Sequence, residues 1–229
     1  MISSILQDRV NTRCFSDKEI PTEIIQELLE VLNRIPVKEN QLPTNVYVLG
    51  KNATAEKEEF YINTECAPKV FNPQVLAPLT FCFSRKSEML DGNGTTDLTV
   101  PEGQIHMLHR MYCGMASMAI ALSAIDQGLQ VGFCQSGGIM PWKHERGGSF
   151  QHNGEKVQVE LSLGVGYAPD DFTHNQSRIR HPYEKIKDKP QDWLERQQAI
   201  ETNPRPQLAD YVYVIGQDIN LPETWQPEV

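Results

Sequence analysis

Two arginines and an asparagine lie close together near the start of the chain, in the stretch RVNTRCF. Arg9, Asn11 and Arg13 occupy alternate positions, so an extended or a helical backbone can present all three side chains to one ligand. A guanidinium group is a fixed cation whose planar fork binds oxyanions through paired hydrogen bonds. The spacing therefore predicts an anion-binding site, and the alternative is a pair of solvated surface arginines.

Two later stretches carry similar chemistry. Arg178 and Arg180, in SRIR, lie two apart on one face of an extended segment, and guanidinium pairs of this kind suit a phosphate group. The loop IPVKENQLP, residues 35–43, offers Lys38 and Asn40 between two prolines. Each feature alone is more often a solvated surface feature than a ligand site. Their convergence on a single anion is the stronger hypothesis.

The first element that could position the N-terminal arginines is a helix. From Ser16 to Leu32 the apolar residues recur at the spacing of one helical face. Pro21 stands early in this stretch, Thr22 is a candidate cap, and Pro36 marks the end.

Four stretches have the composition of strands. Residues 45–50 form a short β-branched run typical of a buried strand, and residues 78–86 form another. Residues 157–169 alternate and then become continuously apolar, as in a central strand. Residues 211–215, YVYVI, are remote from the others and need a sheet edge to join. The charged stretch 51–60 is expected to be exposed.

The longest element predicted is a helix from Glu102 to Gln127, ended by Gly128 and preceded by a loop over residues 91–104. From Met111 onward apolar residues occupy nearly every face of this helix, which predicts a central, buried helix. These elements predict one α+β domain, residues 1–185. Residues 186–229 are expected to be a C-terminal extension of the same domain, because a short helix and one strand cannot be stable alone.

The overall charge limits the class of partner. A net charge of −9 and a pI near 5.2 argue against a nucleic-acid surface, which needs a basic stripe. The longest apolar run, Met111–Ile125, is 15 residues, too short to cross a bilayer. No signal peptide is recognisable, and five scattered cysteines without a CxxC pair fit a reducing compartment. We therefore expect a cytoplasmic protein with no membrane or nucleic-acid partner.

A metal site is an alternative interpretation of one helix face. His106, His109 and Cys113 lie at positions i, i+3 and i+7, as borderline metal ligands could. Three ligands on one helix rarely close a tetrahedron without a fourth from elsewhere. Buried polar residues that hydrogen-bond at a subunit interface are therefore the preferred explanation.

Several motifs, taken in order, resemble those of the nitroreductase family over residues 5–182. Arg9, Asn11, Arg13 and Phe15 occupy the places of its Arg-x-Ser-x-Arg/Lys-x-Phe opening, with Asn11 in place of the usual serine. Pro36, Asn40 and Pro43 match its next loop, in which Val37 and Lys38 replace a small polar pair. GMASMAIALSAIDQGLQ resembles its dimer-interface helix, ELSLGVGYAP its late strand, and SRIR its phosphate-binding motif.

The resemblance implies an α+β nitroreductase-like fold, with a central mixed or antiparallel sheet flanked by helices and a long buried helix at the interface of a homodimer. It also implies bound FMN. Arg9, Asn11 and Arg13 would hold its ribityl chain, phosphate and pyrimidine edge, and Arg178 and Arg180 would complete the phosphate site. The loop with Val37, Lys38 and Asn40 would close over the flavin from the facing subunit.

The stretch FCQSGG falls where the family lays backbone against one face of the flavin, and without the family it is merely a turn. Its small residues permit close approach; the candidate flavin contacts are Gln135, Ser136, Gly137 and Gly138. Cys134 is expected to be a packed thiol rather than a redox group, because no partner cysteine or activating base is apparent.

The activity implied is that of an FMN-dependent oxidoreductase in which NAD(P)H reduces small acceptors (nitroaromatics, quinones or enones) by a ping-pong mechanism. No catalytic side chain is required, since the flavin does the redox chemistry and the protein binds and orients it. The absence of a GxGxxG motif fits a family in which NAD(P)H binds transiently over the flavin. The alternative is a non-catalytic flavin-binding protein, because the altered residues 37–44 border the expected pocket.

Overall fold

A computed structural model of the chain describes residues 5–6, 9–37, 42–64, 72–90, 101–135 and 148–170, with the backbone alone at 87–90 and 102. The predicted strand at 211–215, the extension 186–229 and most of the loop 91–104 lie outside the described residues. None of the described helices is long and apolar enough to cross a membrane.

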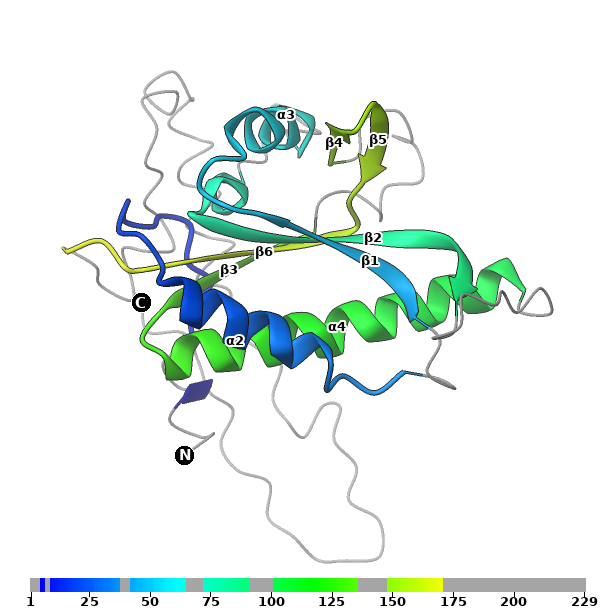
Figure 1. Ribbon diagram of the computed structural model, residues 1–229, viewed down its shortest axis with the longest axis horizontal. Helices are drawn as coiled ribbons and strands as arrows, with labels where there is room; N and C mark the ends of the chain where they lie inside the picture. The colour runs from blue at the N-terminus through cyan, green and yellow to red at the C-terminus, as the bar shows by residue number, and fades with distance from the viewer. Residues whose placement is uncertain are drawn as a thin grey trace, which may run out of the picture.

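The described residues form three layers, of which the middle one is an antiparallel sheet (Figure 1). The strand order is β1-β2-β6-β3, comprising β1 (Leu42–Leu49), β2 (Leu79–Leu90), β6 (Leu161–Gly166) and β3 (Gln130–Cys134). One face is covered by two helices, α2 (Thr22–Leu32) and α4 (Glu102–Asp126). The other face carries α3 (Thr54–Thr64), the 3₁₀ turn η2 (Pro73–Leu76) and a hairpin of β4 (Ser149–His152) and β5 (Glu155–Gln158). The expected α+β class, an antiparallel sheet flanked by helices, is confirmed.

Helix α2 is shorter than the sequence predicts. It begins at Thr22, and the N-cap position is taken by Pro21, whose extended backbone ends the preceding segment without a side-chain cap. The prediction that Thr22 caps the helix is therefore wrong. Residues 16–20 are not helical, and the Ser16 amide instead donates to the Tyr167 carbonyl at 2.9 Å. Leu28, on the inner face, is fully buried.

Helix α4 confirms the longest prediction to within one residue, and Gly128 follows it with a φ of 76°, a conformation that ends helices and favours glycine. Its small and apolar side chains pack under the sheet, including Ala116, Ile120, Ala121 and Ala124. A single chain buries only this side. Four methionines on the other side, Met107, Met111, Met115 and Met118, remain 37–53% exposed.

The charged stretch 51–60 was expected to be exposed, and five of its ten residues are, but Lys57 and Phe60 are buried. Most of it belongs to helix α3, which packs on η2 and β4. Its buried residues are Lys57, Phe60, Tyr61 and Thr64, spaced i, i+3, i+4 and i+7 along one helical face. Phe60 contacts Phe150 of the hairpin edge to face, with ring centroids 6.0 Å apart.

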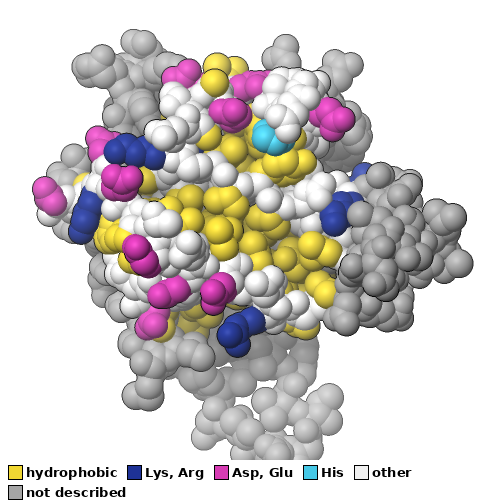
Figure 2. Space-filling view, in the orientation of Figure 1, with side chains coloured by type: hydrophobic (Ala, Val, Ile, Leu, Met, Phe, Trp, Pro, Cys, Tyr) yellow, Lys and Arg dark blue, Asp and Glu magenta, His cyan; other side chains and the backbone are white. Residues whose placement is uncertain are grey.

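The single strand predicted at 157–169 is two strands, β5 and β6. They are separated at Val159 and Glu160, whose amides donate to the carbonyls of Gly148 and Phe83 rather than continuing one ladder. The strand predicted at 45–50 is present as β1, but it lies at the edge of the described sheet, and most of its residues from 45 to 49 are half-buried or exposed rather than buried. Hydrophobic side chains gather along β1 on the face shown in Figure 2.

The sheet separates two hydrophobic clusters. The larger cluster lies between the sheet and the helices α2 and α4, and includes Phe81, Phe83 and Leu163. The smaller cluster lies between the sheet and the layer of α3 and the hairpin, and includes Phe60 and Phe150. These clusters fix the sheet, whose β3 edge carries the candidate site.

Candidate functional site

The N-terminal segment 9–16 runs beside β3 at the edge of the sheet. The Thr12 amide donates to the Val131 carbonyl at 2.8 Å. The Phe133 amide donates to Asn11 Oδ1 at 2.6 Å, so a side chain of the segment completes a hydrogen bond to the edge strand. The segment is thereby held at the sheet edge through both its backbone and the Asn11 side chain.

Burial along this segment alternates with a period of two, as in an extended strand. Val10, Thr12 and Cys14 are 4%, 0% and 8% exposed. Arg9, Asn11 and Arg13 are half-buried, on the other side. Of the two backbone geometries that the sequence left open, the extended one is confirmed, and it presents the two guanidinium groups and the amide on one side.

Gly132 allows this close approach. A Cβ atom at this position would lie 2.0 Å from the Thr12 carbonyl oxygen and 2.8 Å from Gln74 Cβ. Both distances are below ordinary van der Waals contact, so a residue with a side chain would force the N-terminal segment away from β3. A glycine here is thus a requirement of the site and not only of the strand.

The end of β3 leads into the predicted flavin-contacting stretch. Gln135 is exposed immediately after the strand, two residues beyond the Phe133 amide that Asn11 binds. The structure therefore brings Asn11 to the strand end from which Gln135 continues, whereas Thr12, which bonds Val131 and Gln130, lies further from that end. Ser136, Gly137 and Gly138 lie outside the described residues.

The remaining predicted site residues are not brought to this edge within the described chain. Val37 is half-buried against the larger hydrophobic cluster, on the α2 and α4 side of the sheet. Lys38, Asn40, Arg178 and Arg180 lie outside the described residues. Their roles stay predictions.

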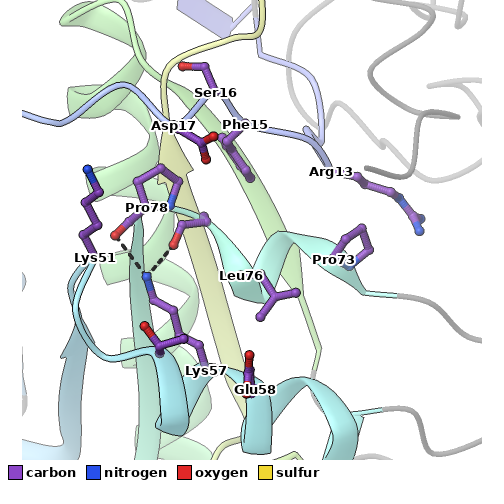
Figure 3. A pocket seen from close by; sticks show the side chains of 12 residues that line it. Arg13, Phe15, Ser16, Asp17, Lys51, Lys57, Glu58, Pro73, Leu76 and Pro78 are labelled. Atoms are coloured by element: carbon purple, nitrogen blue, oxygen red, sulfur yellow. Dashed lines mark hydrogen bonds between the residues drawn. The ribbon is translucent and has the colours of Figure 1, made fainter. Parts of the chain in front are cut away.

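A cavity of about 500 Å³ lies next to the same segment (Figure 3). Arg13 and Phe15 contribute to its wall from the N-terminal segment, Lys57 from α3 and Leu76 from η2. In Figure 3 the Arg13 side chain extends away from the Lys57 end of the cavity. Arg13 is therefore shared between the predicted anion site and this cavity.

Lys57 is a buried cation that the sequence analysis missed. The residue is 5% exposed, and its ammonium donates to the carbonyls of Ala77 at 2.7 Å and Pro78 at 3.0 Å. Burial lowers the pKa of Lys57 to about 8, because desolvation disfavours the charged form. The i, i+3, i+4, i+7 pattern of residues 57, 60, 61 and 64 was the signal that could have placed this lysine on an inward face.

A second buried polar cluster surrounds His109 on α4. Its Nδ1 lies 2.8 Å from Thr44 Oγ1, and its Nε2 lies 3.7 Å from Glu160 Oε2. Glu160 also pairs with Arg85 and Arg110, each at 3.8 Å. Burial lowers the pKa of His109, with Glu160 opposing and the neighbouring cations reinforcing the shift. Burial therefore favours the neutral form of the ring.

The metal interpretation has no support in this cluster. Among the described residues, no group of three or more His, Cys, Asp or Glu side chains is arranged to hold a metal ion. His109 instead contacts Thr44, and the Cys113 sulfur lies 3.5–3.6 Å from its ring nitrogens. Burial raises the pKa of the Cys113 thiol to about 12. Cys134, 3% exposed within the smaller cluster, is a packed thiol as predicted.

Solved structures resemble this arrangement although the sequences are distant. The chain resembles a nitroreductase family protein from Streptococcus pneumoniae (TM-score 0.51, 15% identity, 83% of this chain and 100% of that one). It also resembles an FMN-dependent nitroreductase from Clostridium difficile (0.51, 15%, 81% and 96%). A third neighbour is a putative NAD(P)H:FMN oxidoreductase from Staphylococcus epidermidis (0.53, 13%, 83% and 96%).

The chain has the nitroreductase fold. The resemblance that the sequence motifs suggested is thus confirmed at the level of fold. No protein-family profile and no curated protein sequence matches the chain. At identities of 11–17% the three-dimensional likeness shows the fold and leaves the activity to be argued from the residues.

Proposed function

We propose that the protein is an FMN-dependent oxidoreductase, active as a homodimer, in which NAD(P)H reduces small acceptors such as nitroaromatics, quinones or enones by a ping-pong mechanism. The main support is the position of Arg9, Asn11 and Arg13. On a nitroreductase fold, these three side chains lie together on one side of an extended segment that is anchored to β3.

The described residues fit a flavin mononucleotide. Arg9 and Arg13 are half-buried cations, which suit a phosphate or the electron-rich pyrimidine edge. Asn11 accepts a hydrogen bond from Phe133 through Oδ1, and its amide nitrogen remains a donor for a ribityl hydroxyl. Lys38, Asn40, Arg178 and Arg180 would complete the site, and Gln135 to Gly138 would lie against one flavin face.

When bound, FMN would supply the redox chemistry, accepting a hydride from NAD(P)H and passing electrons to the acceptor. The part of this chain is to hold and orient it. The arginines fix the anionic end, and a cation beside the pyrimidine edge stabilises the negative charge that develops there on reduction. No side chain has to act as an acid, base or nucleophile.

The homodimer is supported by an exposed apolar stripe and by an open edge of the sheet. The four methionines of α4 form a stripe at i, i+4, i+8 and i+11 that no described residue covers, and large exposed apolar stripes mark interaction sites. We assign this stripe to a second copy of the chain. The apolar edge strand β1 is open on its outer side among the described strands, and we assign it to residues 211–215 of the partner.

The proposal is tested by FMN binding to the variants Arg9→Ala and Arg178→Ala. Each removes a charge-assisted hydrogen bond worth about 1.5–3 kcal/mol, so FMN affinity should fall about tenfold or more. Arg34→Ala is the matched control, since this arginine is exposed just after α2, and its affinity should equal that of the parent. Parental affinity in both test variants would show that the site is misplaced.

Colour distinguishes the enzyme from a non-catalytic flavin-binding protein. A yellow purified protein that NADPH or NADH bleaches supports the oxidoreductase. A yellow protein that neither nucleotide bleaches would identify a flavin-binding protein without this activity. A colourless protein that takes up no FMN would overturn both.

A further inference from the structure

The cavity beside Arg13 contains a cation whose position the flavin site does not explain. Lys57 is buried, and the chain supplies no carboxylate in contact with its ammonium among the described residues. A buried charge without a counterion costs several kcal/mol. A glutamine would donate two hydrogen bonds to the same carbonyls without that cost, so bridging Ala77 and Pro78 does not by itself require a lysine.

The ammonium also has a donor to spare. It carries three N–H groups, and within the described chain only the carbonyls of Ala77 and Pro78 accept from it. Because Lys57 forms part of the cavity wall, the third donor is available to a ligand there. Figure 3 shows the ammonium between the two carbonyls at one end of the cavity.

The surroundings favour an anion. Lys51 and the first turn of α3, represented in the wall by Thr54 and Lys57, lie at the same cavity, and a helix N-terminus carries a partial positive charge. Two carboxylates, Asp17 and Glu58, line it as well, but both are exposed and therefore screened by solvent. The buried cation dominates the field within the cavity.

The rest of the wall selects an organic anion over an inorganic one. Phe15, Leu76 and Pro73 provide apolar surface beside the charged end, and about 500 Å³ holds a molecule of the size of an aromatic acid. We propose that this cavity binds a small organic carboxylate, whose oxygen accepts the third hydrogen bond of the Lys57 ammonium while its apolar body packs against Phe15 and Leu76. The cavity shares Arg13 with the proposed flavin site, but the Arg13 side chain extends away from the Lys57 end (Figure 3), and the inference does not depend on bound FMN.

Benzoate is the probe and benzamide its uncharged counterpart. At pH 7, where Lys57 is still cationic, benzoate should bind one to one by calorimetry and shift the NMR resonances of the Lys57 side chain. Benzamide should bind about tenfold more weakly or not at all, since it brings no charge to the ammonium. Benzoate affinity should also fall as the pH rises above 8. Equal binding of the two probes, or no benzoate binding, overturns the proposal.

The variant Lys57→Met keeps the apolar stem and removes the ammonium. Its benzoate affinity should fall about tenfold or more. Lys51→Met is the matched control, because this lysine is exposed at the same cavity, and it should lose less than about threefold. Retained affinity in Lys57→Met overturns the proposal. Should that variant fail to fold, the benzamide comparison and the Lys57 resonances in the parent protein decide.

Addition of FMN separates this inference from the proposed function. Benzoate should bind with the same affinity with and without FMN if the two sites are distinct. Displacement of benzoate by FMN would show that the cavity is part of the flavin pocket and would overturn the inference while supporting the flavin site. A protein that takes up no FMN but binds benzoate through Lys57 would support this inference and overturn the proposed function.

Discussion

Replacing Gly132 with alanine tests whether the Arg9–Arg13 segment depends on its contact with β3. The new Cβ would start 2.0 Å from the Thr12 carbonyl oxygen, and real Cβ contacts essentially never fall below 3.0 Å. The segment must therefore move by about 1 Å or more. A shift of this size lengthens the 2.8 Å hydrogen bond from Thr12 to Val131 beyond bonding distance and misaligns the Asn11 bond to Phe133.

The cost can be worked from these contacts. Two lost hydrogen bonds contribute about 1 kcal/mol each, and overpacking at a close contact adds about 1–3 kcal/mol. We expect the free energy of unfolding to fall by about 3–5 kcal/mol in Gly132→Ala, measured by urea denaturation followed by circular dichroism. FMN affinity, measured by quenching of flavin fluorescence, should fall as well, because Arg9 and Arg13 move with the segment.

Gly103→Ala is the control for the glycine substitution itself. This glycine lies in the first turn of α4 with nothing within 4 Å of the new Cβ, so the variant should be as stable as the parent or slightly more stable. If Gly132→Ala unfolds at the parental urea concentration and binds FMN normally, the segment does not depend on β3 and the reasoning fails.

Three further outcomes follow from the other features. The free energy of unfolding should fall from pH 7 to pH 5, by up to about 1.4 kcal/mol per pH unit, because the pKa of His109 is lowered in the folded protein and the unfolded chain therefore binds more protons. His109→Gln should flatten this pH dependence in urea titrations. His152→Gln, at an exposed position, should leave it unchanged. Met111→Glu should convert dimer to monomer in light scattering, whereas Ile62→Glu, equally apolar and exposed on α3, should leave the dimer intact. Removal of residues from Asp210 onward should weaken the dimer, and an unchanged dimer would argue against strand addition at β1.

The sequence predicted best where one signal dominated. Helix α4 was placed to within one residue because its long apolar run is followed by Gly128, a residue type that commonly ends helices. Helix α3 was missed because its charged residues suggested an exposed segment, and a lysine was not expected among its buried residues. The break between β5 and β6 depends on the Glu160 amide, which binds the distant Phe83 carbonyl, and no local pattern encodes that contact.

In the candidate site, too, local features could be predicted from the sequence and contacts between distant residues could not. The alternating positions of Arg9, Asn11 and Arg13 could be recognised from the sequence because the three residues are neighbours in the chain. The Asn11 bond to Phe133 and the contact of Gly132 with Thr12 join residues about 120 positions apart, and only the packed structure reveals them. The cavity at Lys57 has the same origin, since its wall is assembled from three separate elements.

The alternation along residues 9–14 separates two kinds of requirement within one short segment. Substitution at Val10, Thr12 or Cys14 should lower the stability of the fold. Substitution at Arg9 or Arg13 should change ligand affinity instead. Ligand preference can therefore change through single exchanges at the outward positions without endangering the scaffold. Such a segment is a natural starting point for altering, by directed evolution, which ligand the proposed site binds.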